Sequence, residues 1–194
     1  MDHTRRGALR LLGGGATIAL AGCLGPGGDG STLTGTEPAP VAVRSSRPNW
    51  HDRDEVVGFV AVIDGRDRAE TALSQFDRPA ERAETVDAFV AETDFQTERL
   101  LLVETVGPNA CYSEVEFSDL HLDGGSLTGT AQATPREADA CAEVITYPSA
   151  LLRATFEGAP AETAEIEVRD GWGHSAVLAG STTTDLAEFA PQSS

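Results

Sequence analysis

Short apolar runs, separated by glycine, proline and aspartate, dominate the chain between residues 41 and 168. Runs of this length bounded by turn residues are typical of β-strands. We predict strands at 41–43, 56–63, 100–106, 112–122, 127–133, 141–147, 151–157 and 164–168. The first is a short edge strand, and Pro148-Ser149 separates two of the later ones. In the last run, apolar and charged residues alternate, which indicates a half-solvated strand.

The segment 79–92 carries a helical pattern instead. Pro79 suits the first position of a helix, and the alanines and glutamates that follow favour its interior. Its apolar residues fall on one face at three- and four-residue steps: Ala83, Val86, Phe89 and Val90. The sequence therefore predicts one amphipathic helix.

The segment 112–122 changes face along its length. Val115 and Phe117 share one parity, whereas Leu120 and Leu122 have the other. A strand changes face only at an irregularity, so we expect a β-bulge near Ser118-Asp119. The glycines of Asp123-Gly124-Gly125 then predict a tight turn.

Most of the connections between these runs are too short for a parallel crossover. We therefore expect a mostly β, α+β fold. It would be an antiparallel β-sandwich or a half-open barrel with one packed helix.

The N-terminal stretch has the pattern of an export signal. Arg5 and Arg6 precede an apolar run at 11–21, which is shorter than the roughly 20 residues that span a bilayer. A weakly hydrophobic run behind a twin arginine resembles a Tat signal, which exports folded proteins. Leu20-Ala21-Gly22-Cys23 resembles a lipobox, so Cys23 is the predicted lipidation site; an ordinary signal with an incidental cysteine is the alternative. We expect a lipid-anchored protein on the outer face of the cytoplasmic membrane.

These patterns divide the chain into four regions. Residues 1–22 are the predicted signal peptide. Residues 23–40, rich in Gly, Pro, Ser and Thr, are predicted to be a lipidated, disordered tether. A single β-rich domain is expected at 41–180 and a flexible tail at 181–194.

The charge is strongly acidic. The 194 residues have a formal net charge of −17, and all 14 basic residues are arginine. The acidic residues are dispersed, which resembles the proteins of extreme halophiles, in which such surfaces stay hydrated in concentrated salt. Binding of cations or of a basic partner is the other interpretation. The same charge excludes nucleic acid, whose binding needs clustered basic residues.

Two cysteines remain after Cys23. An even pair in an exported protein favours a disulfide, so we predict a bond between Cys111 and Cys141. A redox pair is the alternative, but such dithiols usually have two residues between them. A zinc site would need more nitrogen or sulfur ligands nearby.

The histidines give weak candidates for a site. His51 lies beside Asp52, Asp54 and Glu55, the one local group that could bind a cation. His121 is expected on the solvent face of its strand, and His174 could approach Asp170. No nucleophile elbow, phosphate loop or His-Glu-x-x-His motif is present. We therefore predict no catalytic residue and no cofactor.

The segment 89–156 resembles a known family. "FVAETDFQTERLLLVETVG", "CYSEVEFSDLHLDGGSLTGTAQA" and "ITYPSALLRATF" follow the order of features in the C-terminal domain of PrcB-type lipoproteins. These are small β domains associated with a surface protease. The family's Gly-Gly-Tyr before the hairpin is replaced here by Ala110-Cys111-Tyr112. The resemblance implies a β domain that binds or supports another protein.

From the sequence we predict a non-enzymatic binding or accessory module whose partners are the membrane, through Cys23, and another cell-surface protein. Two alternatives remain. One is a small extracellular hydrolase that uses His174 or His51 in a deep pocket. The other is a cation-binding module centred on Asp52, Asp54 and Glu55.

Overall fold

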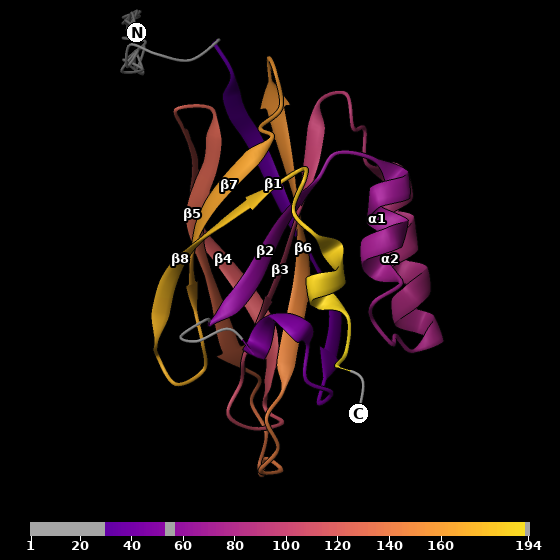
Figure 1. The fold of residues 1–194 in the computed structure, drawn as a ribbon, viewed down its shortest axis with the longest axis vertical. Helices are drawn as coiled ribbons and strands as arrows, with labels where there is room; N and C mark the ends of the chain where they lie inside the picture. Colours follow the sequence, from indigo (N-terminus) through magenta and orange to yellow (C-terminus); the bar gives the residue numbers. More distant parts are fainter. Residues whose placement is uncertain (1–29, 53–56, 193–194) are drawn as a thin grey trace, which may run out of the picture.

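Two four-stranded sheets stack face to face in the computed structural model, which describes residues 30–52 and 57–192 (Figure 1). The first sheet has the order β1 (Thr32–Arg44), β6 (Tyr147–Glu157), β3 (Glu98–Thr105), β2 (Gly58–Ile63). The second has the order β4 (Tyr112–Asp123), β5 (Ser126–Pro135), β7 (Thr163–Arg169), β8 (Ser175–Ser181). The predicted mostly β fold is confirmed, as a sandwich.

Helices cover the outer face of the first sheet (Figure 1). They are α1 (Arg66–Leu73), α2 (Ala80–Glu92) and two short 3-10 helices, η1 (Asn49–Asp52) and η2 (Leu186–Phe189). The helix predicted at 79–92 is confirmed as α2. The eight-residue α1 was missed because only Ala69, Ala72 and Leu73 of its residues are buried, too few to give a clear helical period.

Burial on one or both faces explains the two kinds of strand pattern. β2, β3 and β6 lie between the helices and the second sheet, so their apolar runs are nearly continuous. β7 has solvent on one face, and its alternating pattern buries Ala164, Ile166 and Val168 against the first sheet. The sequence pattern thus indicates which strands lie in the middle of three layers, which are the helices, the first sheet and the second sheet.

The face change predicted in 112–122 is confirmed. The pairing of β4 with β5 shifts register between Ser118 and His121, and Asp119 has a φ of 54°. This is the one non-glycine residue with positive φ in the described chain, and aspartate tolerates that conformation. The hairpin turns at Asp123–Ser126, through Gly124 and Gly125, as expected.

The predicted tether is wrong for residues 32–40. β1 starts at Thr32 and pairs antiparallel with β6, from Thr32 opposite Glu157 to Arg44 opposite Tyr147. Most of its first half is exposed. Backbone pairing orders this polar segment, and a search for apolar residues cannot detect such an edge strand.

The flexible tail predicted at 181–194 is also wrong over its described part. β8, which the sequence did not reveal, ends at Ser181, and η2 then buries Leu186 and Phe189 against the first sheet. The backbone N–H of Asn49 donates to the carbonyl of Ala190 at 3.0 Å, and that of Gln192 donates to Arg47 at 2.8 Å. The C-terminal segment is therefore docked.

The strand predicted at 141–147 is not formed, and β6 instead continues through Pro148 and Ser149. Pro148 lies opposite Val43 of β1, whereas the pairing with β3 ends at Ser149 opposite Glu104. The missing N–H of Pro148 is tolerated because Pro148 lies beyond the last residue of β6 that pairs with β3. One pair also departs from the expected antiparallel order: β5 and β7 are parallel, because the chain crosses to the first sheet as β6 between them.

The two sides of the sandwich differ. Near β2 and β8 the sheets approach closely, since a Cβ added to Gly180 would lie 2.9 Å from the carbonyl oxygen of Val60. On the opposite side, the edge strands β1 and β4 leave a groove between them. No helix in the described ranges has the length and apolarity needed to cross a membrane.

Candidate binding groove

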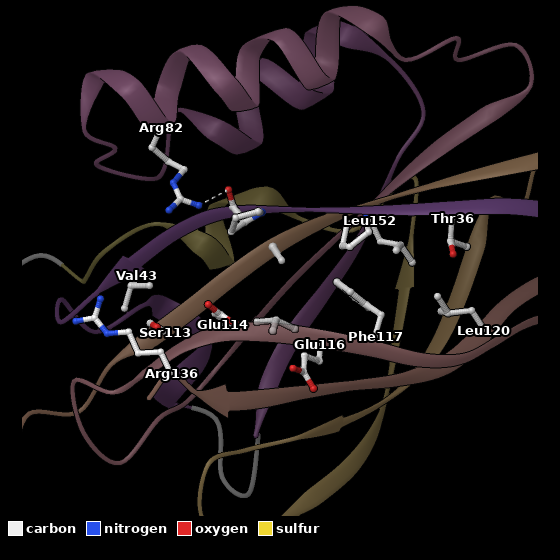
Figure 2. Close-up of a pocket in the computed structure, with 14 residues that line it drawn as sticks. Thr36, Val43, Arg82, Ser113, Glu114, Glu116, Phe117, Leu120, Arg136 and Leu152 are labelled. Carbon is white, nitrogen blue, oxygen red and sulfur yellow. Dashed lines mark hydrogen bonds between the residues drawn. The ribbon is translucent and has the colours of Figure 1, made fainter. Parts of the chain in front are cut away.

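A groove of about 630 Å³ lies between the edge strands β1 and β4. This volume is within the range of roughly 300–1,000 Å³ that is typical of ligand sites. Figure 2 shows the groove with β1 and α2 on one side and β4 on the other. The sandwich is thus open along one edge, and the opening has the size of a binding site.

The floor of the groove is apolar. Val115 and Phe117 project from β4, and Ala150 and Leu152 project from β6. Leu120 joins them because the bulge at Ser118–His121 returns the strand to the same face. Phe117 and Leu120 are only half-buried, so a ligand could cover apolar surface that water now contacts.

The groove has a charged end and an uncharged end. Figure 2 shows Arg136, Val43 and Ser113 together at one end, with Arg82 of α2 nearby, whereas Thr36 and Leu120 lie at the other end. Glu114 lies beside the two arginines, and Glu116 points away along the rim. These residues are distant in the sequence, and sequence reasoning singled out none of the arginines.

The two edge strands offer different backbone groups. β1 has Pro38 and Pro40 facing the groove, and proline has no N–H. The carbonyl oxygen of Pro40 accepts a hydrogen bond from Arg82 Nη1 at 3.2 Å. β4 contains no proline between Tyr112 and Asp123, and its outer edge has no strand partner in the described chain. β1 therefore lacks two backbone donors along the groove, whereas β4 keeps its own.

The disulfide region braces the charged end. The structure brings the sulfur atoms of Cys111 and Cys141 to bonding distance, with their Cα atoms 5.4 Å apart. The backbone N–H of Arg136 donates to the Cys111 carbonyl at 2.9 Å. Thr146 Oγ1 also donates toward the carbonyls of Asn109 and Tyr112. Arg136 is thus held beside the start of β4.

His174 does not line the groove. Its role and its exposure also differ from those of the groove residues. Its Nδ1 is 2.9 Å from Asp170 Oδ2, as the sequence suggested, but 72 % of its side chain is exposed. Asp170 Oδ1 accepts the backbone N–H groups of Trp172 and His174 at 2.9 Å. The pair therefore closes the turn between β7 and β8, and the deep pocket expected of a hydrolase does not contain it.

His51 also lies outside the groove. Its ring packs edge-on against Trp50, at 5.6 Å between centroids, and against Tyr147, at 5.4 Å. His121 is exposed on β4, as expected. The structure does not bring His51 and His174 together in a pocket.

Several predicted residues lie outside the described part of the chain. These are Arg5, Arg6 and Cys23 of the signal, and Asp54 and Glu55 of the cation candidate; the side chain of Asp52 is also not described. Within residues 30–52 and 57–192, no group of three His, Cys, Asp or Glu side chains could hold a metal ion.

A buried ionic cluster was missed by sequence reasoning. Glu104 is fully buried and forms two hydrogen bonds with Arg44, at 2.8 Å from Nε and 2.7 Å from Nη2. Trp50 Nε1 donates to the same carboxylate at 2.7 Å. Arg44 also donates to the carbonyls of Gln75 and Phe189. A glutamate inside the apolar run 100–106 was the available signal.

Burial raises the pKa of Glu104 to about 7, against the opposite effect of Arg44 and Trp50. A carboxylate with such a pKa can mark a catalytic site. Here it is enclosed by protein and does not line the groove. Its contacts join β1, β3, η1 and the C-terminal segment, which is a structural role.

Comparisons of the chain with protein-family models, with curated proteins and with solved structures found no match. The candidate functional site is therefore identified from the geometry of the chain alone. It is the groove between β1 and β4.

Proposed function

We propose that this chain is an exported lipoprotein whose domain binds an extended segment of another protein in the groove between β1 and β4. Cys23 carries the lipid, and the domain acts on the outer face of the cytoplasmic membrane. The twin arginine, the lipobox and the acidic composition support export and anchoring. The groove supports binding.

The observation that carries the proposal is an apolar groove beside an unpartnered strand edge. An extended peptide can add to such an edge through main-chain hydrogen bonds, while alternate side chains enter the pockets beside it. β4 supplies the edge, and Phe117, Leu120 and Leu152 supply the apolar surface.

β4 is the strand that receives the peptide. Pro38 and Pro40 remove two donors from β1, so that edge is protected against pairing. The regular part of β4, between its two register shifts, runs from Glu114 to Ser118. This length limits the bound strand to a short segment, which is typical of reversible peptide recognition.

The start of β1 sets how far the domain reaches. Because β1 begins at Thr32, eight residues separate it from Cys23, and the nine Cα-to-Cα steps from Cys23 to Thr32 span at most about 32 Å. The groove is thus kept close to the membrane, where a partner would be anchored or exposed.

Peptide selection tests the binding proposal. A displayed library of short peptides is selected on the folded domain, and the affinity of the selected sequence is measured by calorimetry. We expect apolar residues at alternate positions. Methylation of every second peptide amide should abolish binding, because those amides face β4, while methylation of the intervening amides should be tolerated.

A matched pair of variants locates the site. Phe117→Ala should weaken binding about tenfold or more, whereas Val177→Ala on β8, which is 69 % exposed, should leave it unchanged. Failure to select any peptide would contradict the proposal, as would binding that tolerates methylation at every amide.

Mass spectrometry of the native protein tests the anchoring. The expected mass is that of a chain beginning at an acylated Cys23. A chain that still begins at Met1, or an unmodified thiol at Cys23, would contradict it.

A further inference from the structure

Two arginines at one end of the groove lack a carboxylate partner among the residues that the structure describes. The guanidinium groups of Arg44, Arg78, Arg153 and Arg169 each pair with a glutamate or aspartate. Arg82 donates to a backbone carbonyl, as Arg66, Arg68 and Arg99 also do, and the Arg136 guanidinium has no hydrogen bond or ion pair with any described residue. In a chain with 31 acidic residues, this makes the charged end of the groove a place where a negative group from outside can bind.

The direction of β4 says which end of a bound peptide reaches these arginines. β4 begins beside them, at Tyr112 and Ser113, and runs toward Leu120 (Figure 2). A strand that pairs antiparallel to β4, the more stable arrangement, runs from Leu120 toward Ser113. Its C-terminal end therefore arrives between Arg82 and Arg136.

We infer that the groove binds the C-terminal segment of a partner protein, with the terminal carboxylate held by Arg82 and Arg136. This inference rests on the proposed function, because it requires strand addition to β4. Guanidinium groups hold carboxylates through paired, charge-assisted hydrogen bonds. The apolar side chains of the segment cover Phe117, Leu120 and Leu152.

A neighbouring acidic residue further restricts the charge that a ligand can carry. Glu114 lies on the same rim as the two arginines, and it repels a second negative group. A ligand with a single carboxylate at its end and apolar residues before it satisfies this arrangement. An acidic peptide does not.

The test compares two forms of one peptide. The sequence selected from the library is synthesised with a free C-terminal carboxylate and with a C-terminal amide, and both are titrated into the full domain. Because a charge-assisted contact is lost, the amide should bind about tenfold to a hundredfold more weakly. In molar potassium chloride the difference should shrink, since exposed charges are screened.

Variants of single arginines provide the second readout. Arg136→Gln and Arg82→Gln should each reduce the ratio between carboxylate and amide affinities, while the affinity of the amide itself stays unchanged. Arg169→Gln is the control, because Arg169 pairs with Glu167 on β7, at 2.9 Å, away from the groove. It should leave both affinities unchanged.

The possible outcomes separate the two proposals. Equal affinities of the two peptide forms would overturn the inference and leave strand addition standing. Absence of binding by either form would overturn the proposed function as well. A long-chain fatty acid is included as a further probe: binding of the fatty acid without binding of any peptide would assign the groove to a lipid and overturn both.

Discussion

At the scale of single residues, Glu104 is a charged side chain that is fully buried. Its carboxylate is enclosed in the core, where Arg44 and Trp50 hold it with hydrogen bonds of 2.7–2.8 Å. Burial nevertheless raises its pKa from an ordinary 4.5 to about 7. Between these two pH values the folded state binds more protons than the unfolded state, so ionisation of Glu104 works against folding.

The proton that Glu104 binds in the folded state should affect how the free energy of unfolding depends on pH. The stabilising contribution of protonated Glu104 is complete below pH 4.5 and is lost as pH rises through about 7. The free energy of unfolding, measured in urea at a series of pH values, should therefore fall more steeply over this window in the native sequence than in Glu104→Gln. Parallel profiles for the two proteins would contradict the assignment.

A second residue-scale prediction concerns the C-terminal segment. Phe189 is completely buried and packs edge-on against Phe59, with ring centroids 5.0 Å apart. Phe189→Ala should lower the free energy of unfolding by about 3–5 kcal/mol, because it leaves a cavity in the core. Val177→Ala, at a position on β8 that is 69 % exposed, is the comparison in urea denaturation. Equal stabilities would mean that the segment is not part of the core.

Among elements, the close approach of β2 and β8 keeps the far side of the sandwich shut. A Cβ at Gly180 would meet the backbone of Val60 at 2.9–3.0 Å. Gly180→Ala should therefore destabilise the protein by about 1–3 kcal/mol. Gly65→Ala is the matched control, since nothing lies within 4 Å of the added Cβ there. Thermal unfolding that ranks the two variants in the opposite order would refute this account.

The disulfide acts at the other side, next to the groove. The two cysteines are 30 residues apart in the sequence. Closing a loop of that length contributes about 3–4 kcal/mol to the free energy of unfolding on the chain-entropy model. Replacing both Cys111 and Cys141 by serine should cost this stability and raise hydrogen exchange in residues 136–146. Peptides with a C-terminal carboxylate should then lose affinity more than amides, because Arg136 is no longer braced.

The strands differ in how far the sequence could predict them. Central strands such as β2 and β3 can be predicted from the sequence, because burial on both faces requires continuous apolar residues. Only the end of β1, at 41–43, could be recognised, because backbone pairing with β6 holds an earlier segment whose side chains are mostly exposed. The strand expected at 141–147 is absent for the opposite reason: Val144 and Ile145 are apolar but exposed, in the segment that follows Cys141.

The groove was beyond the reach of sequence reasoning, except for one feature. The parity change between Phe117 and Leu120 predicted the bulge, and the bulge is what places both side chains on the groove floor. Arg82 and Arg136 come together only through the tertiary fold, from α2 and from the segment after β5. No local pattern marks them.

At the scale of the whole molecule, the charge decides the conditions in which the fold is stable. A net charge of −17 repels itself in dilute buffer, and the Debye length falls to about 3 Å in 1 M salt. The melting temperature should therefore rise steadily as potassium chloride is added from the millimolar to the molar range. A melting temperature that is independent of salt would argue against adaptation to a saline environment.

The path of β1 beside the groove orients a bound partner. β1 starts at Thr32, passes Thr36 at the uncharged end and reaches Val43 at the end that holds Arg136 (Figures 1 and 2). A tail bound as inferred enters at Thr36 and stops at Arg136. If the domain is anchored through Cys23 as proposed, the rest of the partner then lies on the side nearest the membrane. Suitable partners would be integral membrane proteins with a short, apolar, outward-facing C-terminus, and the domain would cover that terminus.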